Sequence, residues 1–315
     1  MIGKLPPEDL EKFVLQYNGA SSKNVISGPS IGEDSAVIKF DSDKYLLASS
    51  DPIVGADNSD VGKFLIDINV NDISAKGGTP KYLILTLIAP SKLGKKYIKE
   101  VMKDIDKYAK KYNIAIIGGH TEISNKYNAP VITATILGES DKIYNVNNIK
   151  FKDPVYLIGN VALEGIYLLY KKHEKKLKNL LTESEKKDVL SYITKLSIYK
   201  YSKIAKNYSH FMHDPTEGGL IGGLSEISSL MKDKGIILNK KIKLLNPVRK
   251  ISDFFNIDPH HLISSGSLLT IINKNKEKYF LSEISKTKFP YQKIGYIGKE
   301  NSFTISHKEE LWDNL

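Results

Sequence analysis

The chain of 315 residues contains no cysteine. This absence excludes disulfide bonds, cysteine nucleophiles, thiolate zinc sites and thiol carriers. Because cysteine-free chains occur in every compartment, the absence restricts the chemistry of the protein more than its location.

Long apolar segments are absent as well. No apolar run approaches the roughly 18–20 residues that a membrane helix needs. The first residues, MIGKLPPEDLEKF, have no apolar core of the signal-peptide kind. We therefore expect a cytoplasmic protein that does not associate with a membrane.

Acidic residues are outnumbered: 46 Lys and Arg stand against 36 Asp and Glu, which gives a net charge of +10. A basic protein can bind polyanions. Much of the lysine, however, lies in spaced patterns such as KKYIKEVMKDIDKYAKKY (95–112), which are typical of solvated helix faces. No recognised nucleic-acid motif accompanies the charge, so nucleic-acid binding is not expected.

The length favours about two domains, and the pattern of elements restarts near residue 150, where FKDPVYLIGN predicts a strand. We place the domains at residues 1–149 and 150–315, each an α/β (α+β) unit. The elements expected in the first domain are helices at 6–17, 61–76 and 92–112 and strands at 35–40, 44–50, 81–90, 113–119 and 130–140. Those expected in the second include a helix at 164–172 and strands within 262–273 and 293–298.

Two carboxylates stand beside glycine or proline at the boundaries of predicted strands. In GPSIGEDSAVI (28–38), Gly32 permits a tight turn and Asp34 precedes a strand, although a polar loop would look the same. In ASSDPIV (48–54), Asp51 ends an apolar strand and Pro52 prevents its regular continuation. A carboxylate at a strand end is a common ligand position in α/β proteins, and it is equally common in simple turns.

A third carboxylate lies inside a predicted helix. The stretch INVNDISAKGG (68–78) places Asn71 and Asp72 within an apolar stripe that includes Val70 and Ile73. Polar groups at such a place cost stability unless they are paired or bind a metal. The alternative is that Asn71 and Asp72 lie on an exposed side of the helix.

The stretch IAIIGGHTEIS (114–124) predicts an apolar, buried strand that runs directly into Gly118 and Gly119, followed by His120, Thr121 and Glu122. Backbone amides freed by glycines can cradle phosphate oxygens, while hydroxyl and acidic groups orient a metal. A lone histidine is usually a surface residue, but the position of His120 after a glycine pair at a strand end makes it a candidate.

The stretch FMHDPTEGGLIGG (211–223) places Asp214 before a proline turn, and Gly218 and Gly219 at the start of a predicted helix. Asp214 can accept hydrogen bonds from turn amides or hold a cation, and a helix N-terminus there suits a phosphate. The alternative is a capped helix with tight packing.

Taken together, the carboxylates at positions 33, 34, 51, 72 and 214 indicate a magnesium–nucleotide site. Magnesium is usually held by a few carboxylates together with substrate phosphates. The sequence has no Walker-type G-x-x-x-x-G-K-[ST] and no kinase-type glycine loop, so the nucleotide must be held in another way.

These stretches, from GPSIGEDSAVI through SSDPIV, VNDISAKGGTP, IGGHTEIS and HDPTEGGL to LISSGSLL (262–269), resemble the AIR synthase (PurM) superfamily almost end to end. The superfamily includes HypE, thiamine-monophosphate kinase, selenophosphate synthetase and formylglycinamidine synthase. The chain is most similar to HypE and to an archaeal HypE-like, AIR synthase-related group. The resemblance implies a PurM-like fold whose N-terminal sheet dimerises into an intersubunit β-barrel, followed by a C-terminal α/β sandwich domain.

The resemblance also implies that Mg-ATP binds near that dimer interface, with Asp34, Asp51 and Asp72 as magnesium ligands. The nucleotide-binding residues that it implies are Gly32, Asp34, Gly118, Gly119, Thr121, Glu122, Gly218 and Gly219. Asp214 and His120 become the catalytic candidates, and the Gly- and Ser-rich residues 18–31 become a mobile loop that closes over the nucleotide.

Two departures from the family pattern bear on the reaction. HypE ends in a cysteine that carries the carbamoyl group to be dehydrated, whereas this chain ends HKEELWDNL and cannot use that route. In addition, His120 stands where HypE and thiamine-monophosphate kinase have an aspartate. The histidine either weakens one magnesium site or contacts a different acceptor.

We therefore expect a ligase- or kinase-like enzyme that transfers the γ-phosphoryl group of ATP to an oxygen (amide, carbonyl or phosphate) of a small-molecule acceptor. A kinase similar to thiamine-monophosphate kinase is one alternative. A non-catalytic ATP-binding assembly factor related to HypE is the other, and it would bind Mg-ATP without releasing ADP.

Overall fold

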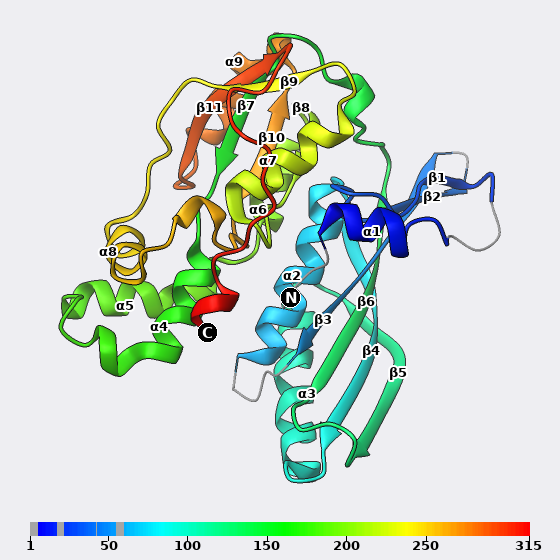
Figure 1. Cartoon of the computed structure of the whole chain (residues 1–315). Helices are drawn as coiled ribbons and strands as arrows, with labels where there is room; N and C mark the ends of the chain where they lie inside the picture. Colours follow the sequence, from blue (N-terminus) through cyan, green and yellow to red (C-terminus); the bar gives the residue numbers. More distant parts are fainter. Residues whose placement is uncertain (1–5, 18–21, 42, 55–59) are drawn as a thin grey trace. The chain divides into compact units, whose positions relative to one another are not determined.

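The computed structural model describes residues 6–17, 22–41, 43–54 and 60–315 (Figure 1). The chain forms two compact units. The N-terminal unit comprises Ser22–Gly28 and Asp34–Ile143. The C-terminal unit comprises Tyr144–Leu315 together with Pro29–Glu33 and the described part of residues 1–21. The mobile loop expected at 18–31 lies partly outside the described residues, and within it Val25–Ser27 form strand β1.

Among the described residues, the N-terminal unit holds one six-stranded sheet in the order β1-β2-β3-β6-β4-β5. Strands β4 and β5 run parallel, and all other neighbours are antiparallel. The strands are β1 (Val25–Ser27), β2 (Ala36–Asp41), β3 (Lys44–Val54), β4 (Thr79–Pro90), β5 (Ala115–Ser124) and β6 (Val131–Ser140). The strands expected at 35–40, 44–50, 81–90 and 130–140 are thus confirmed.

Helices α2 (Val61–Ala75) and α3 (Gly94–Lys111) pack against each other and against one face of this sheet (Figure 1). Helix α3 buries Tyr97, Val101, Ile105 and Ala109 at a spacing of four residues, while its lysines are exposed. The lysine-rich pattern at 95–112 is therefore a solvated helix face. Helix α2 is buried along almost its whole length, and Gly77 follows its end as expected.

Strand β5 differs from the expectation in both burial and length. Ile116 and Ile117 are 36% and 54% exposed instead of buried, because β5 is an edge strand that pairs only with β4. The strand also continues through Gly118 and Gly119 to Ser124, so the glycine pair does not stand at a strand end. Residues 114–117 are all apolar, so neither face of the strand is marked as polar. Hydrophobic periodicity alone therefore could not distinguish this exposed strand from a buried one.

Strand β3 likewise continues past its expected end. Asp51 and Pro52 pair with Ala134 and Thr133 of β6, so Asp51 lies within the strand. The pairing of β2 with β3 extends along β3 only as far as Ala48. Among the described residues, the remainder of β3 therefore pairs with β6 alone, and proline is tolerated where one edge of a strand is unpaired.

The C-terminal unit contains a second, antiparallel sheet in the order β8-β10-β7-β11-β9. Its strands are β7 (Pro154–Ile158), β8 (Ser209–His213), β9 (Gly235–Leu238), β10 (Leu268–Ile272) and β11 (Tyr291–Gly298). Helices of this unit are α1 (Pro7–Phe13), α4 (Leu163–Leu177), α5 (Glu183–Ser191), α6 (Tyr199–Ala205), α7 (Gly219–Leu230), α8 (Asn246–Phe255) and α9 (Glu277–Ile284). The strand in FKDPVYLIGN, the helix at 164–172 and the strands in 262–273 and 293–298 are confirmed.

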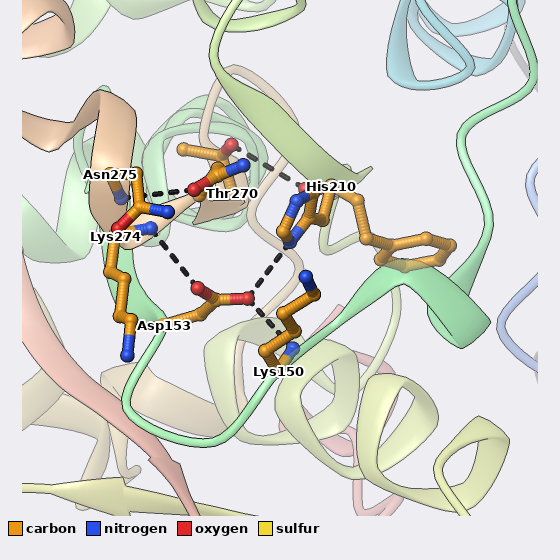
Figure 2. A network of polar contacts seen from close by, with 8 residues as sticks. Lys150, Asp153, His210, Thr270, Lys274 and Asn275 are labelled. Carbon is orange, nitrogen blue, oxygen red and sulfur yellow. Dashed lines mark hydrogen bonds and ion pairs between the residues drawn. The ribbon is translucent and has the colours of Figure 1, made fainter.

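Every residue of β7 and β10 is buried, so the centre of this sheet is covered on both faces. The start of β7 is fixed by the fully buried Asp153 (Figure 2). Its carboxylate accepts hydrogen bonds from the backbone N–H groups of Lys150 (2.7 Å) and Lys274 (3.0 Å), and its Oδ2 lies 2.8 Å from Nδ1 of His210. A buried charge is tolerated when it is hydrogen-bonded in this way, and here it joins β7, β8 and the turn after β10.

No helix in the described parts of the chain combines the length and the apolar character needed to cross a membrane.

Alanine substitutions at Gly118 and Gly119 of β5 test how closely β5 packs against β4. A Cβ atom on Gly119 would lie 1.8 Å from the carbonyl oxygen of Leu85, and the φ of Gly119 is +147°, whereas a Cβ on Gly118 would meet nothing within 4 Å. We expect Gly119→Ala to destabilise the protein by on the order of 2–3 kcal/mol and Gly118→Ala to leave stability unchanged. Thermal unfolding of both variants tests this, and equal melting temperatures would contradict the pairing of β5 with β4.

Candidate nucleotide and metal site

Asp72 lies on the face of α2 that packs against β3. Its side chain is 7% exposed, and the hydroxyl of Ser49 on β3 donates a hydrogen bond to its Oδ2. Asn71, the preceding residue, is fully buried. The alternative that Asn71 and Asp72 occupy an exposed side of the helix is therefore wrong.

Asp51 lies beside the same helix. Its backbone N–H donates to Oδ1 of Asn69 (3.3 Å), and Nδ2 of Asn69 donates to the carbonyl of Leu65 (2.9 Å). Asn69 and Asp72 are three residues apart and so share one face of α2. The structure thus brings Asp51 and Asp72 together with two residues that the sequence analysis missed, Ser49 and Asn69. For Asn69, the sequence did contain a signal: in INVND it is a polar residue three positions before Asp72, so the two share one helix face.

Asp34 precedes β2 by two residues, and the pairing of β2 with β3 begins at Ala36 and Ala48. Of the three carboxylates expected as metal ligands, the structure therefore brings Asp51 and Asp72 to the same part of the N-terminal unit.

Carboxylate and hydroxyl oxygens are the ligands that Mg²⁺ prefers, and it usually completes its shell with water and phosphate oxygens. Within the described ranges, no three His, Asp or Glu side chains form a group that could hold a metal by themselves. The assignment of magnesium to Asp34, Asp51 and Asp72 stays a prediction.

His120 lies elsewhere in the same sheet. Directly paired residues of neighbouring strands point to the same face, and His120 pairs with Thr86, which pairs with Thr133. Asp51 instead pairs with the buried Ala134, on the face covered by the helices. In the N-terminal sheet, the side chains of His120 and Asp51 therefore lie on opposite faces.

The side chains around His120 are open to solvent. The His120 side chain is 67% exposed, and its Nε2 lies 3.3 Å from Oε2 of Glu122. Gly118, Gly119 and Thr121 are also exposed. These residues belong to an accessible edge strand, and their roles toward a nucleotide stay predictions.

The second candidate group lies in the C-terminal unit, where β8 leads into α7. Asp214 follows β8 and is 2% exposed, and the preceding His213 places its Nε2 2.8 Å from Oε2 of the buried Glu226. Helix α7 begins at Gly219 as expected. Gly32 belongs to the same unit, and a Cβ atom there would lie 3.0 Å from the carbonyl oxygen of Glu226.

The glycines at the start of α7 serve close packing. Gly219 has a φ of +61°, and a Cβ there would lie 2.6 Å from the carbonyl oxygen of Leu262. A Cβ on Gly223 would lie 2.8 Å from Cβ of Pro215. This is the tightly packed helix start that the sequence left open as an alternative for this stretch.

Two buried glutamates beside this turn were not recognised in the sequence. Burial raises the pKa of Glu164 to about 7, and the negative charges of Glu309 and Glu217 add to the effect. Burial also raises the pKa of Glu309 to about 7, although N–H groups of Gly218, Leu311 and Ile263 oppose the shift. Nothing in their local sequence marks either residue, because the burial of both depends on contacts between distant segments.

The models of the AIR synthase related protein family match this chain along most of its length. The N-terminal domain model covers residues 32–140 and the C-terminal domain model covers residues 153–308. The protein belongs to this family, and its two-domain α/β architecture is the PurM-like fold, as the sequence predicted.

Curated relatives fall into two groups. A putative hydrogenase expression/formation protein of Methanocaldococcus jannaschii is 25% identical, over 96% of this chain and 90% of the relative. The thiamine-monophosphate kinase of the same organism is 24% identical, over 90% of each chain. The thiamine-monophosphate kinase of Buchnera aphidicola is 27% identical, over 92% of this chain and 90% of the relative.

Solved structures show the same fold. HypE in the HypE–HypF complex superposes with a TM-score of 0.72 at 18% identity, over 88% of this chain and 94% of that chain. AaThiL complexed with AMPPCP and TMP superposes with a TM-score of 0.72 at 20% identity, over 96% of this chain and 93% of that one.

The buried glutamates predict how stability depends on pH. Their ordinary pKa is 4.5 and their pKa in the folded protein is about 7, so between these values the folded state binds more protons than the unfolded state. The free energy of unfolding should therefore fall as pH rises from about 4.5 through about 7, by on the order of 3 kcal/mol for each glutamate. Urea unfolding at a series of pH values tests this, with Glu164→Gln as the variant that should show a smaller decline. A stability that rises across this interval in both proteins would contradict the assignment.

Proposed function

We propose that the protein is a Mg-ATP-dependent enzyme that transfers the γ-phosphoryl group of ATP to an oxygen of a small-molecule acceptor. The observation that supports this most is the polar cluster of Ser49, Asp51, Asn69 and Asp72 between α2 and β3. There the Asp72 carboxylate accepts a hydrogen bond from the Ser49 hydroxyl, and the backbone N–H of Asp51 donates to the side-chain oxygen of Asn69. Burying such groups without a ligand costs stability, so their presence favours a binding role.

In this proposal Asp34, Asp51 and Asp72 hold magnesium. The bound metal would supply the charge neutralisation on which phosphoryl transfer depends. Gly118, Gly119, Thr121 and Glu122 contribute to nucleotide binding, as do Gly32, Gly218 and Gly219. Asp214 and His120 are the proposed catalytic residues, with Asp214 as an acid near phosphate or substrate.

Two groups of relatives support different acceptor classes. Similarity to thiamine-monophosphate kinases supports transfer to a phosphate oxygen, and similarity to a hydrogenase expression/formation protein supports transfer to an amide or carbonyl oxygen. None of the 315 residues is a cysteine, so none of them can carry the transferred group as a thiol. A protein that binds Mg-ATP but releases no ADP with any such acceptor would instead be a non-catalytic assembly factor related to HypE.

We also propose that the protein is a homodimer formed through the N-terminal sheet. Edge strand β5 exposes Ile116, Ile117 and Ile123, and the neighbouring β4 exposes Tyr82 and Ile84, each by 36% or more. Unpaired edges and contiguous apolar patches of this kind are characteristic of association surfaces. Pairing through β5 could close the two sheets into an intersubunit barrel.

Asp72→Asn tests the metal assignment. Asparagine can still accept the hydrogen bond from Ser49, so the fold should be kept, but the loss of charge should abolish magnesium-dependent ATP binding. Calorimetric titration with ATP, with and without magnesium, measures this, and Asp106→Asn on the exposed surface of α3 is the control. If Asp72→Asn binds Mg-ATP as tightly as the wild type, the ligand assignment is wrong.

Ile117→Lys tests the dimer. Lysine on the exposed edge strand should place a charge in the proposed interface and convert the dimer to a monomer. Tyr279→Lys, at a 65% exposed position on α9, should leave it a dimer. Light scattering after size-exclusion chromatography distinguishes the two masses. A monomeric wild type, or a dimer that survives Ile117→Lys, would count against this interface.

A further inference from the structure

The C-terminal segment, residues 307–315, contacts two loops of the C-terminal unit. The backbone N–H of Glu310 donates to the carbonyl oxygen of His261 (3.1 Å), at the start of the loop that leads to β10. Nε1 of Trp312 donates to Oε2 of Glu217 (3.3 Å), in the turn that precedes α7. The segment therefore lies against both the turn before α7 and the loop before β10.

The carboxylate of Glu309 joins these two loops directly. Its Oε2 accepts a hydrogen bond from the backbone N–H of Gly218 (2.7 Å) in the turn. Its Oε1 accepts from the N–H of Ile263 (3.2 Å) in the loop, and from the N–H of Leu311 (2.8 Å) in the segment itself. Hydrogen bonds to an ionised carboxylate are stronger than those between neutral groups. Because each oxygen is bound to a different loop, neither loop can shift without breaking one of these bonds.

The turn before α7 needs such a contact, because its own backbone is permissive. Gly218 and Gly219 both have left-handed φ values, +80° and +61°, and glycine has the largest conformational freedom of any residue. A further link to the loop is the carbonyl oxygen of Thr216, which accepts the N–H of Ser264 (3.3 Å). Asp214, two residues before Thr216, is 2% exposed. The turn that carries Asp214 is thus held at Thr216 and, through Glu309, at Gly218.

We propose that Glu309 is a positioning residue: by holding the N–H groups of Gly218 and Ile263 together, it fixes the turn that carries Asp214. The contacts of Glu309 do not depend on the reaction, whereas the role of Asp214 in it rests on the proposed function. A displacement of about 1 Å in an active site can lower a rate about a hundredfold. Glu309 can therefore govern turnover without touching ATP or the acceptor.

Hydrogen exchange tests whether Glu309 fixes the turn. In Glu309→Gln one oxygen acceptor is replaced by an NH₂ group, so the N–H groups of Gly218 and Ile263 should exchange about tenfold faster or more. The N–H of Ile236, which donates to the side-chain oxygen of Asn301 (2.7 Å), is the internal control and should keep its rate. The protein is kept at about pH 8.5, because burial raises the pKa of Glu309 to about 7 and the carboxylate must be ionised.

Turnover tests the consequence for the reaction. With water as the acceptor, Glu309→Gln should lower the kcat of ADP release from Mg-ATP about tenfold or more, while the KM for Mg-ATP changes much less. Glu309→Asp keeps the charge but is one methylene shorter, so it should be impaired in the same way. Glu310→Gln, whose carboxylate contacts Nζ of Lys308 (2.6 Å) instead of the turn, is the matched control and should behave as the wild type.

The outcomes separate the proposal from the function on which it rests. Unchanged exchange at Gly218 in Glu309→Gln, or wild-type turnover in both Glu309 variants, would overturn the proposal. Wild-type behaviour of Glu309→Asp alone would do the same, because charge rather than these contacts would then matter. A wild type that releases no ADP would refute the proposed function instead, and the exchange rates would still decide whether Glu309 fixes the turn. If Glu309→Gln does not fold, Glu309→Asp carries the same two measurements.

Discussion

The burial of polar side chains along α2 is the constraint on which the N-terminal unit depends. Toward its start, the fully buried Asp67 pairs with Lys63 and accepts a hydrogen bond from the Tyr112 hydroxyl (2.6 Å), which ties α2 to the end of α3. Toward its end, Asn69 and Asp72 meet β3. A small rotation of the helix would leave several of these groups buried without partners, so the same contacts that fix the fold also fix the carboxylates.

One carboxylate in each unit accepts hydrogen bonds from neutral donors. Ser49 donates to Asp72, and the backbone N–H of Gly218 donates to Glu309. Such bonds orient a carboxylate through its local contacts.

Much of this architecture could be predicted from the sequence, since helical spacing located α2 and α3 and glycine marked the starts and ends of helices. The resemblance to the AIR synthase superfamily supplied the fold. The exposure of β5 could not be predicted, because an apolar edge strand whose side chains are exposed looks like a core strand in the sequence. The extension of β3 through Pro52 depended on where β2 stops pairing. Glu164 and Glu309 were missed because they are brought together by tertiary packing.

The assignment of Pro29–Glu33 to the C-terminal unit has a consequence for how the protein can be divided. The chain leaves the N-terminal unit after Gly28 and returns to it at Asp34, and Gly32 packs against the backbone of Glu226 on α7. Neither unit is a continuous piece of chain. Separating the halves near residue 150 would take from the C-terminal half a segment that it packs against, so the two units are covalently interleaved and should unfold as coupled partners rather than as independent modules.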